Sequence, residues 1–153
     1  MGSDRRFSLA SARTAAAEER TALWVGDFLA SRGSDNAPLA AALATKRHWW
    51  YGPARVPIER IVRLAGPEPD ALLPMEPETY EDDVDAMVDS LEEGWQPPPL
   101  ILEYRDGDLL LQDGTHRLEA LVRDGETDAW ALVYFDDRET RDDFARKLSA
   151  SGA

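Results

Sequence analysis

The chain has 153 residues, of which 43% are hydrophobic and 31% are charged, and it carries a formal net charge of −13. This length and composition predict one globular domain that is long enough to bury a core. The absence of cysteine excludes disulfides, thiolate catalysis and cysteine metal sites, and the two histidines offer little material for a histidine-rich site.

No apolar run approaches the roughly 20 residues that a membrane span requires, and the N-terminus lacks the layout of a secretory signal. We therefore expect a cytoplasmic protein with no membrane partner. The charge is unevenly distributed: residues 1–65 carry ten basic and six acidic side chains, residues 66–95 carry no basic and eleven acidic ones, and residues 96–153 carry seven basic and thirteen acidic ones. Because an acidic surface repels phosphate backbones, direct binding to duplex nucleic acid is not expected. A local basic pocket for a small anion is still compatible with this charge.

The first third of the chain has a helical pattern. The alanine-rich residues 9–30 predict one helix, and a second short helix opens at Pro38. The segment RHWWYGP, residues 47–53, breaks this helix at its Gly-Pro step. Its aromatic and basic side chains could stack on a base or grip a phosphate, or they could pin the helices against a sheet. We treat residues 1–53 as an N-terminal helical extension and residues 54–153 as the main domain.

The middle of the chain predicts a strand, a loop and a helix. Residues 56–64 are rich in β-branched side chains and predict a first strand, and the proline-rich residues 66–78 predict a loop. Thr79 followed by Asp82 resembles a capping box. It predicts the start of an amphipathic helix over residues 79–93, with a strongly acidic outer face.

The last third predicts a hairpin, a helix, a strand and a final helix. Two apolar runs joined by Asp-Gly, between Leu100 and Leu111, predict the hairpin. A helix that stops at Gly125 follows, then a strand over residues 129–135, and Asp136 or Asp137 caps the final helix.

The stretch DLLLQDGTHRLEALVRDG, residues 108–125, places Asp-Gly directly between a strand and a helix. The N–H groups at such a helix start converge on anions, and the helix dipole adds partial positive charge. Gly114 permits close approach of the backbone, Thr115 offers a hydroxyl, and His116 and Arg117 add donors that suit phosphate. The layout predicts a phosphate cradle.

A structural interpretation of the same residues stays open. Asp113 and Gly114 would then form a turn, and Thr115 would cap the helix. His116 would be satisfied by a backbone carbonyl, and Arg117 would pair with the acidic helix. Short motifs of this kind have high false-positive rates, so a longer pattern is needed.

The order of elements from Val56 to Phe135 resembles the ParB/sulfiredoxin superfamily, over roughly half of the chain. The resemblance implies an α+β fold, a small mixed sheet with packed helices, here preceded by the N-terminal helical segment. It also implies that the turn between strand and helix binds nucleotide phosphates. His116 and Arg117 stand where sulfiredoxins have His-Arg, but Thr115 takes the place of their catalytic cysteine, so sulfinic-acid reduction is excluded.

The motifs are more similar still to the free serine kinase branch, archaeal enzymes that phosphorylate serine with ADP. The Asp-Gly-x-His-Arg turn of that branch falls at residues 113–117, its Trp-x-Pro at residues 95–97 and its Tyr-Phe-Asp at residues 134–136. The resemblance implies that Glu76, before the long helix, is a general base; the alternative is a solvated loop carboxylate. The large C-terminal extension of the kinases and the helix-turn-helix domain of ParB are not found in this sequence.

Two functions follow from these patterns. The first is a phosphotransferase or nucleotide hydrolase that uses ATP, ADP or CTP, with Mg²⁺ carried by the nucleotide, a small hydroxyl-bearing acceptor, and Glu76, Asp113 and His116 as candidate catalytic residues. The second is a module without catalysis that senses a nucleotide or binds a basic partner protein through the acidic helix. No metal site made by the protein alone is predicted, and the acidic surface disfavours a ParB-like nuclease.

Overall fold

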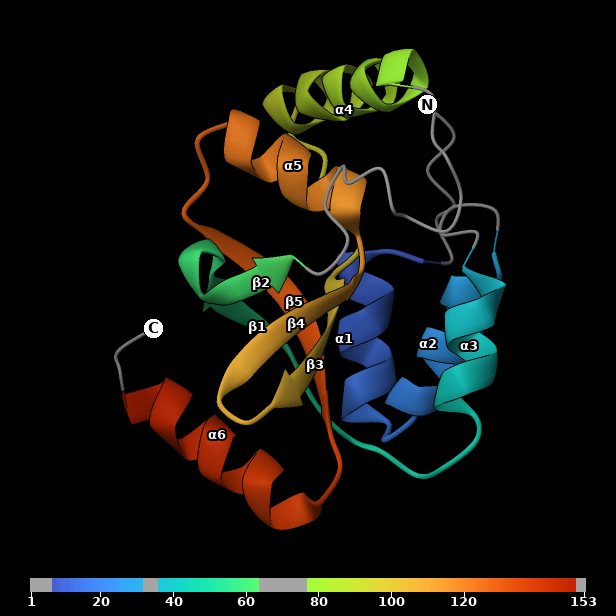
Figure 1. The fold of residues 1–153 in the computed structure, drawn as a ribbon, viewed down its shortest axis with the longest axis vertical. Coiled ribbons are helices and arrows are strands. Elements are labelled where there is room, and N and C mark those ends of the chain that lie inside the picture. Colours follow the sequence, from blue (N-terminus) through green and yellow to red (C-terminus); the bar gives the residue numbers. More distant parts are fainter. Residues whose placement is uncertain (1–6, 32–35, 64–76, 151–153) are drawn as a thin grey trace.

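The structure is a computed structural model that describes residues 7–31, 36–63 and 77–150. These residues form six α-helices and a five-stranded mixed sheet, which confirms the predicted α+β class. The elements are α1 (Leu9–Ala17), α2 (Thr21–Ala30), α3 (Ala37–Leu43), β1 (Trp49–Pro57), the short 3₁₀ helix η1 (Ile58–Arg60), β2 (Ile61–Arg63), α4 (Pro77–Glu92), β3 (Leu100–Arg105), β4 (Asp108–Asp113), α5 (Thr115–Arg123), β5 (Asp128–Phe135) and α6 (Arg138–Ala150). Figure 1 shows α1, α2 and α3 grouped together, α4 lying along α5, and α6 at the other end of the molecule.

The strand order of the sheet is β1-β5-β3-β4-β2, so β1 and β2 are its edges. The pairs β3–β5 and β2–β4 are parallel, and the pairs β1–β5 and β3–β4 are antiparallel. Near the start of β3, Ile101 pairs with Asp113 at the end of β4. Further along β3, Glu103 pairs with Tyr134 near the end of β5. The ends of β4 and β5 therefore lie toward opposite ends of the sheet.

Both faces of the sheet are buried, because successive side chains of β3 and β5 alternate between two cores. One core joins Leu100 and Leu102 to α5 and α6, and the other joins Ile101, Leu132 and neighbouring residues to α1 and α2. This explains why both strands are almost continuously apolar rather than alternating. The N-terminal helices thus cover one face of the sheet, and the predicted domain boundary at residue 53 falls inside β1.

The N-terminal half corrects two of the predicted elements. The single helix expected over residues 9–30 is two helices, because Glu19 has φ of 58° and the N–H of Arg20 bonds to the carbonyl of Ala15, which ends α1. The single strand expected over residues 56–64 is wrong as well. The segment instead forms β1, which begins earlier at Trp49, then η1 and β2.

The later elements confirm most of the prediction. Asp106 and Gly107 join β3 to β4 with φ of 51° and 90°, the positive values that a tight two-residue hairpin turn needs. Gly125 ends α5 with φ of 85°, and the carboxylate of Asp137 accepts the N–H of Thr140 at 2.7 Å at the start of α6. Helix α4 begins at proline 77, before the predicted cap, because proline suits a first helical position. Within the described ranges, no helix is long and apolar enough to cross a membrane.

Candidate functional site

The predicted phosphate cradle lies where β4 passes into α5. Gly114 makes this turn with φ of 111°, a conformation that other residues rarely adopt. A Cβ atom at Gly114 would lie 2.6 Å from Cδ2 of Leu100 and 2.9 Å from Nη2 of Arg117. Glycine is therefore required by both the backbone conformation and the close packing of the protein's own side chains.

A buried ion pair holds this turn together. Nη2 of Arg117 lies 3.1 Å from Oδ2 of Asp113 and donates to the carbonyl of Pro99 at 3.3 Å. The side chains of Asp113 and Arg117 are each 8% exposed. The other oxygen of Asp113 accepts from Asn36 at 2.9 Å, and the guanidinium carbon of Arg117 lies 5.2 Å from the ring centre of Phe28. Asp113 and Arg117 thus link β4, α5, the segment before β3 and the N-terminal helices.

The start of α5 presents backbone donors that suit an anion. Its N-cap residue, Gly114, has no side chain that could cap the helix, and the first backbone bond of the helix runs from the N–H of Leu118 to the carbonyl of Gly114. The preceding N–H groups of any α-helix have no partner inside the helix. Thr115 places its hydroxyl at the first helical position, partly exposed. This arrangement of backbone donors and a hydroxyl fits a phosphate group.

His116 lies half-buried between α5 and α4. Its Nε2 is 4.0 Å from Oδ2 of Asp83, and its side chain is 24% exposed. Burial lowers the pKa of His116, and the nearby Asp83 acts in the opposite direction. The imidazole is therefore mainly neutral at pH 7 and can accept a proton there.

The acidic helix α4 is joined to α5 by Arg123 rather than by Arg117. Nη1 of Arg123 lies 2.9 Å from Oε2 of Glu81 and 3.5 Å from Oδ1 of Asp85. The hydrogen bond from Arg123 also lowers the pKa of Glu81. The alternative in which Arg117 pairs with the acidic helix is therefore wrong, because Arg117 points into the protein toward Asp113.

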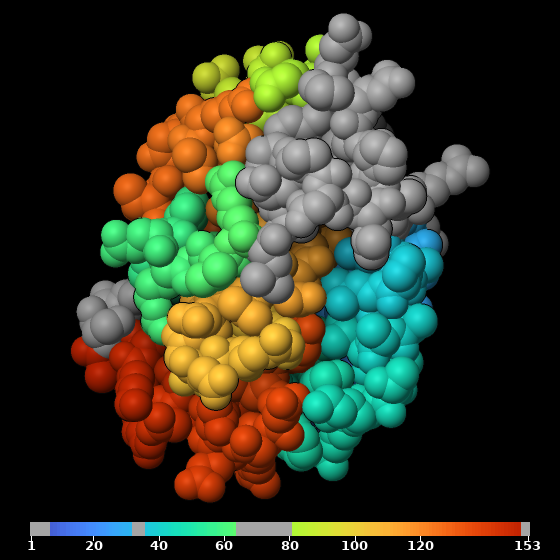
Figure 2. Space-filling view, in the orientation of Figure 1, coloured from blue at the N-terminus to red at the C-terminus, as the bar shows by residue number. Residues whose placement is uncertain are grey.

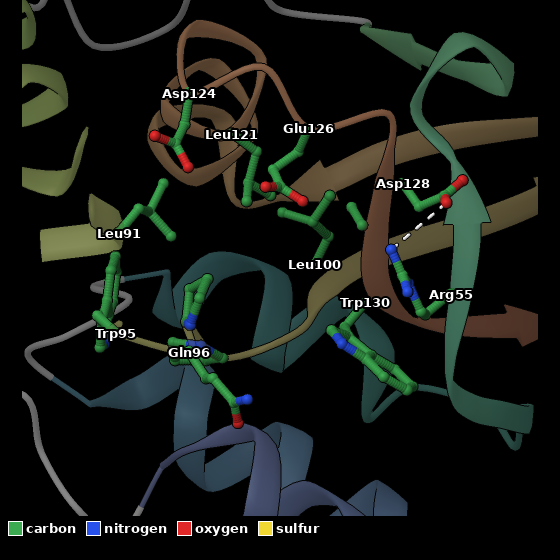
Figure 3. A pocket seen from close by; sticks show the side chains of 13 residues that line it. Arg55, Leu91, Trp95, Gln96, Leu100, Leu121, Asp124, Glu126, Asp128 and Trp130 are labelled. Atoms are coloured by element: carbon green, nitrogen blue, oxygen red, sulfur yellow. Dashed lines mark hydrogen bonds and ion pairs between the residues drawn. The ribbon is translucent and has the colours of Figure 1, made fainter. Parts of the chain in front are cut away.

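The Trp-x-Pro motif lines a different place on the molecule. Residues 95–97, Leu91 of α4 and Leu121 of α5 line a pocket of about 180 Å³. Figure 3 shows Asp124 and Glu126 beside this pocket, at the C-terminal end of α5, whereas the phosphate cradle is at the other end of that helix. Small-molecule sites usually have at least about 300 Å³, so this pocket is small for a nucleotide.

The Tyr-Phe-Asp motif also lies away from the cradle. Tyr134 and Phe135 are core residues, and burial raises the pKa of Tyr134. Asp136 follows the end of β5, and one of its oxygens lies 3.0 Å from Nζ of Lys46. Of the predicted site residues, the structure therefore brings together only those from 113 to 117. Glu76 lies outside the described residues.

Sequence reasoning missed three groups at the turn: the amide of Asn36, the ring of Phe28 and the carbonyl of Pro99. Asn36 could be recognised as a cap of α3, since its side chain also accepts the N–H of Leu39. Its contact with Asp113 spans 77 positions along the chain, and no local pattern signals such a contact.

Five solved chains match this structure, among them a sulfiredoxin and a ParB-N domain. Sulfiredoxin from Arabidopsis thaliana is 20% identical with a TM-score of 0.42, and the match covers 52% of this chain and 81% of that one. A Pnob8-like ParB-N domain is 23% identical with a TM-score of 0.42, and the match covers 67% of this chain and 36% of that one. No family model and no curated protein matches the chain. Both likenesses are of the fold alone.

Proposed function

We propose that this chain is a cytoplasmic nucleotide-binding protein that holds nucleotide phosphates at the start of α5. The observation that carries the proposal is the helix start itself, which follows Gly114, a residue with no side chain to cap it, and has Thr115 at its first position. Convergent N–H donors and the helix dipole both favour a phosphate at such a point. The resemblance of the Asp-Gly-x-His-Arg turn to nucleotide-binding members of the superfamily supports the same ligand.

In this proposal, the residues of the turn have two different roles. The backbone N–H groups of the first turn and the hydroxyl of Thr115 bind phosphate, while Asp113 and Arg117 fix the turn from inside. A direct contact of Arg117 with phosphate stays a prediction, and its burial supports the positioning role. Mg²⁺ would arrive on the nucleotide and offset its phosphate charge.

A thermal-shift panel of ATP, ADP, CTP, GTP and AMP with Mg²⁺ tests the proposal. A nucleotide at about 100 times its Kd stabilises the native state by about 2.7 kcal/mol, which raises the Tm of a domain of this size by about 5–10 °C. Thr115→Asp should abolish this shift, because it places a carboxylate where phosphate would lie. The same change stabilises the free helix through its dipole, so it tests binding without weakening the fold.

Thr115→Asn is the matched control, because it has nearly the same shape without the charge, and it should keep most of the shift. A wild-type protein that responds to no nucleotide would overturn the proposal. So would a Thr115→Asp variant with an unchanged response.

A second candidate function, phosphotransfer to a hydroxyl, is favoured by His116. The largely neutral imidazole directly follows Thr115 and could accept the proton of a hydroxyl-bearing substrate. His116→Gln should then abolish turnover and keep the nucleotide-induced shift in Tm. If the wild type binds nucleotide without turnover, the chain is a sensing module, and basic proteins become the partners to test against the acidic face of α4.

A further inference from the structure

A larger pocket lies among the N-terminal helices, the start of the edge strand β1 and α6, and no residue of α5 lines it. Residues of α2, α3 and the segment that leads into β1 line it, together with Arg141 of α6. Its volume is about 830 Å³. This lies within the range of about 300–1,000 Å³ that is typical of small-molecule sites.

The floor of this pocket is made of small residues. Its lining includes Ala22 and Gly26 of α2, and Ala40 and Ala44 at α3. A Cβ atom at Gly26 would meet no heavy atom within 4 Å, so open space begins directly at the α2 backbone. The exposed side chain of Leu23 extends this apolar surface to the rim. The floor can therefore accept the apolar body of a ligand without displacing a side chain.

One side of the pocket is formed by residues 47–50 of the segment RHWWYGP, which include two tryptophans. Trp50 is fixed against Tyr134, with ring centres 5.2 Å apart. Trp49 faces the guanidinium of Arg47, whose central carbon lies 5.0 Å from the ring centre. Trp50 packs on the core of α1 and α2 and Trp49 on the core of α5 and α6, as the structural interpretation expects, and both line the pocket together with Arg47.

The pocket is basic although the whole chain is acidic. Its lining contains Lys46, Arg47 and Arg141 but only one carboxylate, that of Glu19. Lys46 and Arg141 have exposed ion pairs with Asp136 and Asp142, which are weak and exchange readily. Arg47 has no carboxylate partner among the described residues.

Both ring nitrogens of His48 also lack a partner. They are shielded from solvent and make no hydrogen bond in the described part of the chain, while the ring packs on Tyr134 with centres 4.9 Å apart. Buried polar atoms are normally hydrogen-bonded, so such an atom calls for an explanation. Figure 2 shows the segment between α3 and β1 beside the start of α6.

We infer that this pocket binds a small organic anion with an aromatic or apolar body. The body lies against α2 and α3 beside Trp50, and the anionic group is held by Arg47 and Lys46. The site is separate from the turn at Gly114, and it gives a binding role to the helices and the aromatic segment that the proposed function leaves without one.

Two fluorescent probes of similar shape test this inference. Anilinonaphthalene sulfonate carries the anion, and phenylnaphthylamine is its neutral counterpart. The wild type should bind the sulfonate saturably with one probe per chain. Gly26→Leu fills the open space beside α2 and should weaken the binding of both probes at least about tenfold. Ala30→Leu, on the same helix but outside the pocket, should leave the binding of both probes unchanged.

The charge requirement is tested by Arg47→Gln, with Arg146→Gln on the outer surface of α6 as its control. Arg47→Gln should weaken the binding of the sulfonate about tenfold and leave the binding of the neutral probe nearly unchanged. Circular dichroism checks that each variant is folded; if Gly26→Leu fails this check, the comparison of the two probes on Arg47→Gln decides. The inference would be overturned if the wild type showed no saturable binding, if folded Gly26→Leu kept full binding, or if Arg47→Gln weakened the binding of both probes equally. Thr115→Asp should leave probe binding unchanged, which separates this site from the proposed nucleotide site.

Discussion

Replacing Gly114 by alanine should destabilise the protein more than the same change at a positive-φ glycine where an added Cβ atom would meet no neighbour. Gly107→Ala is the matched control, because Gly107 has φ of 90° and a Cβ there meets nothing within 4 Å. An alanine forced into this backbone region costs about 1–2 kcal/mol. At Gly114 the new methyl group also meets Leu100 at 2.6 Å and Arg117 at 2.9 Å, and such overpacking adds about 1–3 kcal/mol. We therefore expect a loss of about 2–5 kcal/mol for Gly114→Ala.

Urea unfolding of the two variants and the wild type measures this difference. The slope of the unfolding free energy against urea should stay the same in all three proteins, so that the change in midpoint reports the native state. If Gly114→Ala and Gly107→Ala lose the same free energy within about 0.5 kcal/mol, the close packing at the cradle does not exist and the positioning role of Arg117 fails with it.

Three further predictions concern other parts of the molecule. Asp113→Ala or Arg117→Ala should cost about 3–5 kcal/mol, and a double-mutant cycle should show that the double variant loses less than the sum, because either change alone leaves a buried charge unpaired. Burial lowers the pKa of His48 and of His116 below 6.5, so these groups bind protons less well in the folded state than in the unfolded chain. Their contribution to stability should therefore be full above pH 6.5 and fall as the pH drops below it. A variant with glutamine at both positions should lose this dependence between about pH 6.5 and pH 5. Gly26→Ala should raise stability by about 0.5–1 kcal/mol in thermal unfolding, because alanine favours a helix interior and its methyl group meets no atom; an unchanged or lower Tm would contradict the open floor of the second pocket.

Local chemistry was enough to predict the turn at the centre of the site. The positive φ of Gly114, the hairpin at Asp106-Gly107 and the end of α5 at Gly125 all follow from residues next to one another in the chain. The two-sided core also follows from apolar strands without alternation.

Features that depend on residues far apart in the sequence could not be predicted from local patterns. The prediction that the Gly-Pro step at residues 52–53 breaks the second helix was wrong, because α3 already ends at Leu43 and residues 52–53 lie inside β1. This strand is an edge strand with an irregularity between Tyr51 and Ala54, and such a strand tolerates proline. The role of Arg117 was predicted from its residue type alone, which suits phosphate as well as carboxylate. Its burial against Asp113, Pro99 and Phe28 depends on the packing of α2 beside the sheet, which no local pattern encodes.

The central claim is that nucleotide phosphates bind at the first turn of α5. A titration of the isotope-labelled protein with ADP and Mg²⁺, followed by amide nuclear magnetic resonance, tests it most directly. The account predicts that the largest changes occur at the N–H signals of residues 115–118, and that Thr115→Asp removes them. Saturable changes confined to other residues, or no change with ADP, ATP or CTP, would contradict it.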